Sequence, residues 1–310
     1  MMALKEARLR ADHPPERSEG LLRALKLGVR RPVTDLFPGD YRSIFSARGT
    51  ELLQVRPYEP GDDVRLIDPS ATARRGEPHI RVHVAEKALT TWMVLDVSPS
   101  MAFGTADRLK ADVAEGIVLV LGHLSARGGN SIGAATFGDR NPQTLLPRGG
   151  RDGTYGLLKL LRQRPDPEAL GATSPAEVLT RISRLARRRA LVVVASDFRG
   201  PRIWRGAMLR LASRHEMIAI EIRDPREQEL PNVGDLFLVD PETGRQLRVD
   251  TSNRRLRERF AAAAAAERTE LAAEFRSLGV DHLVLSTRGD WLRVLASFLR
   301  ERVAKQRGRT

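Results

Sequence analysis

The chain has 310 residues, 41% of them hydrophobic, which is enough for one large domain or two modest ones, each with a buried core. It contains no cysteine, so disulfides, thiolate catalysis and cysteine-bound zinc or iron–sulfur centres are excluded. The net charge of +13 comes mostly from arginine spread along the whole chain. This pattern favours a solvated basic surface over a nucleic-acid-binding protein.

Two features predict where the protein works. The first 20 residues are charged and lack the apolar stretch of a secretory signal. The longest apolar runs, at residues 116–124 and 190–196, are about half the roughly 18 residues that a membrane-spanning helix needs. Together with the absence of cysteine, this pattern predicts a soluble, cytoplasmic protein without a membrane span.

Residues 1–88 have an irregular pattern. An amphipathic helix is predicted near residues 20–29, and β-rich runs at residues 51–56 and 79–84 predict two strands. Proline and glycine punctuate the stretch between them. We expect a small β-containing segment that packs on the main domain.

From residue 89 to residue 304, short apolar runs alternate with amphipathic helical stretches. This alternation is typical of an α/β domain with a doubly wound, mostly parallel sheet. Strands are predicted at residues 91–97, 131–137, 191–196, 217–222 and 282–286. Helices are predicted from about residue 107 onward and at residues 155–162, 175–188, 204–214, 254–278 and 291–303. Residues 305–310 are expected to form a basic tail.

One stretch interrupts the alternation. Residues 236–239 and 246–249 are short β-rich runs, and residues 240–244 between them end in glycine. The pattern predicts a β-hairpin that leaves the main domain near residues 232–250.

The candidate site begins where the first strand of the main domain ends. Asp96 closes an apolar run, and in open α/β sheets ligands bind at the carboxyl ends of the strands. Ser98 and Ser100 follow at alternate positions, so their hydroxyls can converge beside the carboxylate. Asp197 follows another apolar strand in the same way. If the two strands are neighbours at the switch point of the sheet, both carboxylates face one crevice.

These side chains offer two carboxylates and several hydroxyls. Magnesium prefers hard oxygen ligands of this kind and retains some of its waters. An ion held by few carboxylates stays electrophilic and accepts an external carboxylate, which is a chemistry for docking a partner. The alternative is that Asp96 caps the following helix and that the serines satisfy the loop backbone.

The Asp-x-Ser-x-Ser-Met pattern that starts at Asp96 resembles the metal-ion-dependent adhesion site of von Willebrand factor A domains. The resemblance implies a Rossmann-like α/β fold that holds Mg²⁺ or another divalent cation. It also implies that a threonine and a later aspartate complete the ligand shell. Thr173, which precedes a predicted helix, matches the threonine, and Asp197 matches the aspartate. Thr136 is an alternative for the threonine but lies inside a predicted strand.

Residues 56–68, RPYEPGDDVRLID, are similar to the signature of the bacterial family called domain of unknown function 58. The resemblance covers residues 20–303, with one departure at Pro69, where the family usually has tryptophan. Members of the family are commonly encoded beside MoxR-type AAA+ ATPases. The resemblance therefore implies a non-enzymatic, chaperone-like adaptor in protein assembly or maturation, whose partner is such an ATPase or an acidic side chain of a client protein.

Enzymatic functions match the residues less well. An Asp-x-Asp phosphatase would need a second carboxylate where Ser98 stands, and a serine cannot act as its general acid. Ser100 lacks the Gly-x-Ser-x-Gly elbow of a hydrolase nucleophile. His79 and His83 lie in a predicted strand without the glutamate of a zinc helix. We expect no enzyme and keep a metal-dependent phosphatase as an alternative.

Nucleic-acid binding is the other alternative, because the chain is basic. Aromatic residues make up only 5% of the sequence, so the aromatic-interleaved platform of single-strand binders is missing, and we expect no nucleic-acid partner. Asp62 and Asp63 are expected to form a turn by bonding local backbone or Arg65, with a recognition surface as a second hypothesis.

Overall fold

The computed structural model describes residues 53–83, 90–161, 173–240 and 244–307 of the chain. The helix predicted near residues 20–29 lies outside these ranges, as do the outer ends of the strands predicted at 51–56 and 79–84. The inner parts of both strands form as expected, because β1 (Leu53–Pro57) and β2 (His79–His83) pair antiparallel.

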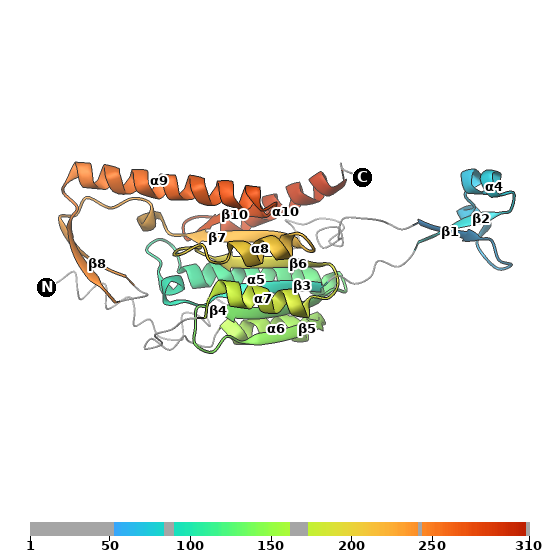
Figure 1. The fold of residues 1–310 in the computed structure, drawn as a ribbon, viewed down its shortest axis with the longest axis horizontal. Coiled ribbons are helices and arrows are strands. Elements are labelled where there is room, and N and C mark those ends of the chain that lie inside the picture. The colour runs from blue at the N-terminus through green and yellow to red at the C-terminus, as the bar shows by residue number, and fades with distance from the viewer. Residues whose placement is uncertain (1–52, 84–89, 162–172, 241–243, 308–310) are drawn as a thin grey trace.

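Between β1 and β2 the chain passes through a short 3-10 helix, η2 (Val64–Leu66), and the helix α4 (Pro69–Arg75), which the sequence pattern did not predict. Asp68 caps α4 by accepting hydrogen bonds from two backbone N–H groups of its first turn. Pro69 fits the first helical position because no N–H is needed there. Figure 1 shows this unit apart from the main sheet, and the packing of residues 1–88 on the main domain remains a prediction.

The main sheet has six strands in the order β10-β7-β6-β3-β4-β5. All neighbours are parallel except β5, which runs antiparallel to β4 at one edge. The predicted doubly wound, mostly parallel α/β fold is therefore confirmed. The strands are β3 (Thr90–Asp96), β4 (Ser131–Phe137), β5 (Thr144–Gly149), β6 (Ala190–Ser196), β7 (Glu216–Arg223) and β10 (Asp281–Ser286).

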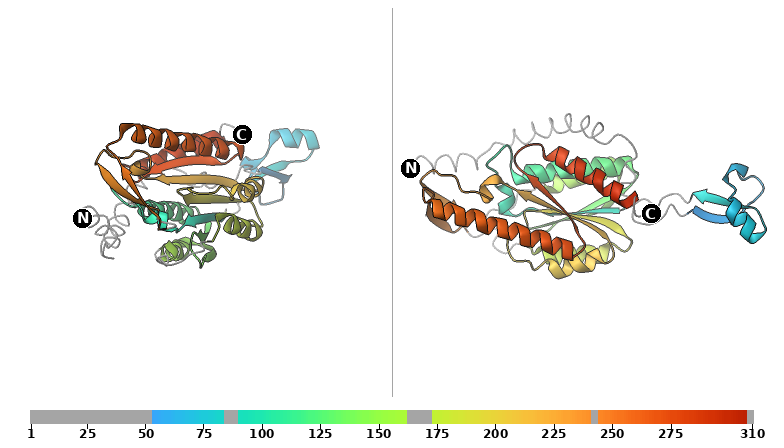
Figure 2. Two further views of the ribbon diagram at one scale, coloured as in Figure 1. Left: turned by 60° about the vertical axis from the view of Figure 1, so that its left-hand side comes forward. Right: turned by 90° about the horizontal axis from the view of Figure 1, so that it is seen from above.

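Helices cover both faces of this sheet, as Figure 2 shows. Each face carries its own apolar core, and the two cores draw on different helices. The first core is covered by α5 (Lys110–Arg127), α6 (Gly150–Leu161) and α10 (Trp291–Arg307). The second is covered by α7 (Pro175–Leu185), α8 (Arg205–Ala212) and α9 (Arg254–Ser277).

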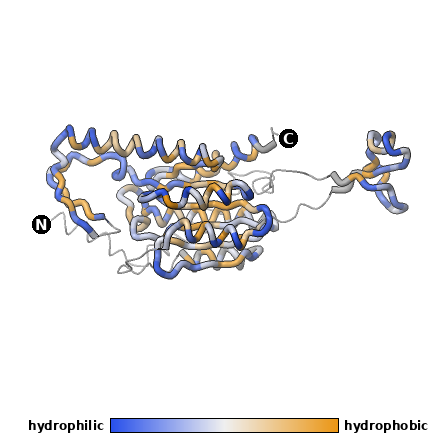
Figure 3. The backbone as a smooth tube through the Cα atoms, in the orientation of Figure 1, coloured by the Kyte–Doolittle hydropathy of each residue, from blue (hydrophilic) through white to orange (hydrophobic). Residues whose placement is uncertain are grey.

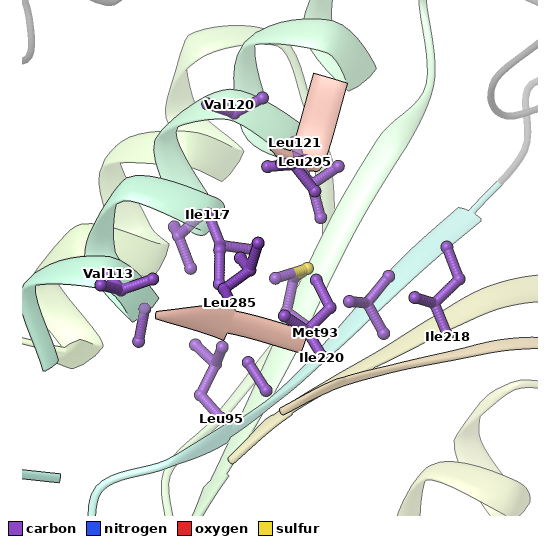
Figure 4. Close-up of a cluster of buried hydrophobic side chains, with 14 of the residues drawn as sticks. Met93, Leu95, Val113, Ile117, Val120, Leu121, Ile218, Ile220, Leu285 and Leu295 are labelled. Carbon is purple, nitrogen blue, oxygen red and sulfur yellow. The ribbon is translucent and has the colours of Figure 1, made fainter. Parts of the chain in front are cut away.

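The residue pattern of β3 shows why the sheet is buried on both sides. Successive side chains of a strand point to opposite faces, so Met93 and Leu95 enter the first core while Trp92 and Val94 enter the second. Figure 4 shows Met93 and Leu95 against apolar side chains of α5 and α10, and Figure 3 shows the apolar strands at the centre of the domain. A run without polar alternation is what a strand with two covered faces requires.

Within the main domain, the structure also differs from the predicted elements at β5, α6 and α10. Strand β5 was not predicted, because its side chains are only partly covered at the sheet edge and show no continuous apolar run. Helix α6 begins earlier than the predicted residue 155. Helix α10 continues to Arg307, so the first half of the predicted basic tail is helical.

The predicted hairpin is confirmed. Strand β8 (Asp235–Val239) pairs antiparallel with β9 (Gln246–Asp250) in a separate two-stranded sheet, and residues 241–243 of its turn lie outside the described ranges. A 3-10 helix, η4 (Pro225–Glu227), lies between β7 and this hairpin. None of the helices in the described parts of the chain is long and apolar enough to cross a membrane.

Candidate metal centre

The two strands that carry the predicted carboxylates are direct neighbours. β3 pairs parallel with β6, and from this pair the sheet grows outward through β4 and β5 on one side and through β7 and β10 on the other. The β3–β6 junction is therefore the switch point, where the chain connections diverge. Asp96 is the last residue of β3 and Asp197 follows the last residue of β6, so both lie at this junction.

The loop after β3, residues 97–101, folds its polar groups onto Asp96. The backbone N–H of Ser98 donates to Asp96 Oδ1 at 2.9 Å, and the Ser98 hydroxyl also bonds this carboxylate. The hydroxyl oxygens of Ser98 and Ser100 lie 3.0 Å apart. Ser98 is the N-cap of a short 3-10 helix, η3 (Pro99–Ala102), and Ser100 lies in this helix. The predicted convergence of the two hydroxyls beside Asp96 is therefore present.

Asp96 is deeply buried, with 6% of its surface exposed. Its second oxygen, Oδ2, accepts a hydrogen bond of 2.5 Å from the Ser196 hydroxyl at the end of β6. Burial, and after it the negative charge of Asp197, raises the pKa of Asp96 from 3.8 to about 6, against the opposing effect of the serine hydrogen bonds. The two carboxylates are thus close enough for the charge of Asp197 to disfavour the charge of Asp96.

The loop after β6, residues 197–200, gives Asp197 a different environment. Asp197 Oδ2 accepts a hydrogen bond of 2.6 Å from Lys110 Nζ, at the start of α5. Burial acts to raise the pKa of Asp197, but the charge and hydrogen bond of Lys110 outweigh it and hold this pKa below its ordinary value. The hydroxyl of Ser100 also bonds Asp197, so Ser100 connects the two loops.

The backbone of the β6 loop is held in an unusual conformation. Phe198 has a φ of 53°, and it is the only non-glycine residue in the described ranges with positive φ. Its ring is 4.9 Å from Phe275 and 5.8 Å from Trp204, both in edge-on geometry, while its N–H donates to the Ser196 hydroxyl. These contacts offset the strain and fix the direction in which Asp197 leaves the strand.

Thr173 is connected to the carboxylates indirectly, through Gly138. Its hydroxyl donates to the carbonyl of Asp139 at 2.6 Å, and its own carbonyl accepts from the N–H of Gly138. Gly138 in turn lies directly against the β3 loop, because a Cβ built on it would come within 2.7 Å of the Ser98 backbone nitrogen. The structure therefore brings together Asp96, Ser98, Ser100 and Asp197 and connects Thr173 to them through Gly138.

Other residues considered in the sequence have structural partners. The Thr136 hydroxyl accepts from the N–H of Gln143 inside the β4 region. The His79 ring is buried and lies within hydrogen-bonding distance of the Glu77 carbonyl. As the predicted turn requires, Asp63 accepts from the backbone N–H of Arg65 and Asp62 accepts from that of Glu59. Asp62 also forms two hydrogen bonds with Arg56.

Two residues of the centre were missed in the sequence. Ser196 could have been noticed as the polar residue that ends an otherwise apolar strand, immediately before Asp197. Lys110, which is fully buried, is harder to notice in the sequence. Its only signal is a lysine in an arginine-rich chain, placed at a helix start where the dipole disfavours a cation. Its two partners come from distant parts of the sequence, so no local pattern reveals them.

The donors present fit a small hard cation. Two carboxylates and two hydroxyls offer oxygen ligands only, the set that magnesium prefers. The described ranges contain no cluster of three or more histidine, cysteine, aspartate or glutamate side chains able to hold a metal. A softer metal that requires nitrogen or sulfur ligands is therefore a poor match to this centre.

A family model described as protein of unknown function DUF58 matches residues 54–270. The chain belongs to the DUF58 family. Uncharacterized proteins of Mycobacterium tuberculosis and Mycobacterium bovis are 36% identical to it over 296 residues, which cover 95% of this chain and 92% of each relative. The predicted family membership is thereby confirmed, and the matched range includes the RPYEPGDDVRLID segment, the candidate centre and the hairpin.

Solved structures similar to this DUF58 protein include a conserved hypothetical protein and a von Willebrand factor type A protein. BatB from Bacteroides thetaiotaomicron is 14% identical, with a TM-score of 0.45, over 70% of this chain and 100% of that one. A von Willebrand factor type A protein from Catenulispora acidiphila is 12% identical, with a TM-score of 0.37, over 71% of this chain and 43% of that one. The fold class of this chain rests on the strand order and helix layers of its own sheet.

Proposed function

We propose that this DUF58 protein is a non-enzymatic adaptor that binds a protein partner through a divalent cation, with magnesium as the preferred ion. Asp96, Ser98, Ser100 and Asp197 supply the ligands, and Thr173 joins them from the loop linked through Gly138. The partner contributes a carboxylate to the ion. A MoxR-type AAA+ ATPase, or a client protein that it acts on during assembly or maturation, is the partner that the family resemblance favours.

The observation that carries the proposal is the pair of buried carboxylates at the switch point. Asp96 is charged at neutral pH only at a cost, since its pKa is raised to about 6 by burial and by Asp197. The groups that favour its charged form are hydroxyls and a backbone N–H, none of which carries a charge. A divalent ion bound to these oxygens would remove the repulsion between the two carboxylates and offset the cost of burying their charge.

A docking role fits this ligand set better than catalysis does. With two carboxylates and neutral hydroxyls as its protein ligands, a dication keeps a net positive charge and attracts a further carboxylate. The basic surface of the chain, with its net charge of +13, would speed encounter with an acidic partner. The position two residues after Asp96 holds Ser98, which cannot serve as the proton donor of an Asp-x-Asp phosphatase.

A pull-down tests the adaptor role. Immobilised chain is incubated with a MoxR-type ATPase in magnesium, with and without EDTA, and in parallel with the variants Asp96→Ala and Asp235→Ala. We expect retention that EDTA and Asp96→Ala abolish and that Asp235→Ala, a change at an exposed hairpin aspartate, leaves intact.

Two results would contradict the adaptor role. Retention that survives both EDTA and Asp96→Ala would remove the ion from the mechanism. DNA or RNA binding that is indifferent to EDTA and falls steeply with salt would favour the nucleic-acid alternative. Phosphate release that depends on Asp96 would instead favour the phosphatase.

A further inference from the structure

Lys110 occupies a position that is unfavourable for a lysine. It is the first residue of the 18-residue helix α5, where the helix dipole repels a positive charge, and its side chain is fully buried. Taking an ammonium group out of water is costly unless close negative partners compensate for it. Such a residue needs an explanation in the groups that it contacts.

Those groups are two carboxylates that lie 87 and 117 residues further along the chain. Lys110 Nζ lies 2.6 Å from Asp197 Oδ2 and 2.7 Å from Glu227 Oε1. Both side chains are nearly as buried as the lysine, with 3% and 10% of their surface exposed. Hydrogen bonds between charged groups at these distances in a site closed to water are strong. Lys110 therefore acts as the counter-charge for one carboxylate of the candidate metal centre and for one residue outside it.

The centre thus contains a cation of its own, but only on one side. Lys110 Nζ donates to Asp197, whereas Asp96 accepts from the Ser196 hydroxyl and the Ser98 backbone N–H, which carry no charge. A divalent ion that binds both carboxylates would meet the ammonium group at Asp197. Two cations that share one carboxylate in a buried site repel each other strongly.

Glu227 gives Lys110 a second anchor that does not belong to the centre. Its other oxygen, Oε2, accepts a hydrogen bond from the backbone N–H of Asp224 at 3.0 Å, which fixes the glutamate on η4. Asp224 is itself fully buried and bonded to the hydroxyls of Thr105 and Thr287. A lysine that gives up Asp197 therefore keeps a rigid charged partner.

We propose that Lys110 is a resident cation that holds Asp197 while no divalent ion is bound and competes with the ion for this carboxylate, retained by Glu227 when the ion takes its place. This inference rests on the metal site of the proposed function. Lys110 thereby regulates that site: it keeps the protein folded without metal and lowers the affinity of the site for the ion. Glu227, which bonds Lys110 and the backbone of Asp224, becomes a positioning residue for metal binding.

Two substitutions with opposite predicted signs test the competition. Lys110→Met removes the competing charge and keeps the length of the side chain, so we expect calorimetric titration with MgCl₂ to show binding tightened by about tenfold or more. Glu227→Gln removes the second anchor at almost unchanged shape. Displacement of Lys110 would then leave an ammonium group without a charged partner, so binding should weaken by about tenfold.

Thermal unfolding supplies the second readout. Without metal, Lys110→Met should melt below the wild type, because Asp197 loses its ammonium partner and Glu227 keeps only Arg199, at 3.8 Å. MgCl₂ should raise the melting temperature of this variant more than it raises that of the wild type. Should Lys110→Met fail to fold without metal, Glu227→Gln alone still carries the test, through the loss of magnesium affinity.

The outcomes separate this inference from the proposed function. If wild type, Lys110→Met and Glu227→Gln bind magnesium with equal affinity, the metal site stands and the competition is overturned. If Lys110→Met binds more weakly than the wild type, Lys110 supports the site and the competition is again overturned. If no variant and no wild-type protein binds magnesium or another divalent ion, both the proposed metal site and the inference fail.

Discussion

The loops that follow β3 and β6 resemble each other in sequence position and differ in electrostatics. Each begins with an aspartate at the carboxyl end of a buried strand, and both aspartates are 6% exposed. Asp96 is surrounded by serine hydroxyls and its pKa is raised to about 6. Asp197 contacts the ammonium group of Lys110 and its pKa is lowered. The buried ammonium group of Lys110 therefore stabilises the charged form of Asp197, and the charged form of Asp96 has no such support from it.

This difference shows that strand position selects where a carboxylate lies, while distant residues set its charge. Lys110, at the start of α5, lies 87 residues before Asp197, and Glu227 lies on η4. The fold brings both residues to the β6 loop. Substitutions at these residues and changes of pH should therefore affect the two loops unequally.

The largest effect is expected from Asp197→Asn. The substitution keeps the shape of the side chain but removes one of the two negative partners of the fully buried Lys110. We expect the free energy of unfolding, from urea denaturation, to fall by about 3 kcal/mol or more, the scale for breaking a buried ion pair. Asp96→Asn is the matched variant and should cost much less at neutral pH, because it removes a carboxylate that is repelled there. Equal losses in the two variants would contradict the asymmetry.

The pH dependence of stability measures the asymmetry directly. The pKa of Asp96 in the folded protein, about 6, lies above the value of 3.8 expected for the unfolded chain. The folded state then binds the proton more tightly, so the contribution of Asp96 to stability is lost as pH rises from about 4 to about 6 and stays lost above. The shift amounts to about 3 kcal/mol. Asp197 has the opposite sign: its contribution is present above its ordinary pKa and is lost only in more acidic solution.

Urea unfolding below and above about pH 6 checks this difference. The wild type, relative to Asp96→Asn, should lose stability as pH rises through this window, and MgCl₂ at neutral pH should restore part of the loss. A wild type and an Asp96→Asn variant with parallel pH profiles would show that Asp96 titrates normally.

A smaller effect is expected at the contact between the β4 end and the β3 loop. Gly138 has a φ of 87°, and an added Cβ would lie 2.7 Å from the Ser98 nitrogen, so Gly138→Ala must displace the β3 loop. We expect a loss of about 1–3 kcal/mol in unfolding free energy, and weaker magnesium binding. Gly149→Ala is the control, since no atom lies within 4 Å of its added Cβ and its φ is not positive. Similar losses from both glycines would mean that the contact with Ser98 is unimportant.

Much of the fold followed from local pattern. The strand at residues 131–137 was predicted with its observed bounds, and the other strands of the parallel sheet within one residue, because apolar runs covered on both faces leave a clear signal. The helix at Pro175 was predicted from its N-terminus, where Ser174 indeed caps the first turn. Strand β5 shows no such apolar run, because the side chains of this edge strand are only partly covered.

The candidate site divides in the same way. Asp96, Ser98, Ser100 and Asp197 could be found because they follow strands whose ends meet at one junction, and the strand order confirmed that β3 and β6 are neighbours. Lys110 could not be found, because its partners Asp197 and Glu227 lie 87 and 117 residues further along the chain. Contacts between residues so far apart in sequence depend on the tertiary structure, and no local pattern in a single sequence predicts them.

The central claim is that the junction between β3 and β6 binds a divalent cation through Asp96. Calorimetric titration of MgCl₂ into the wild type and into Asp96→Asn, with Asp235→Asn on the exposed hairpin as control, tests it most directly. The account predicts saturable heat from the wild type and the hairpin variant and none from Asp96→Asn. Equal heats from all three proteins, or no heat from any, would contradict it.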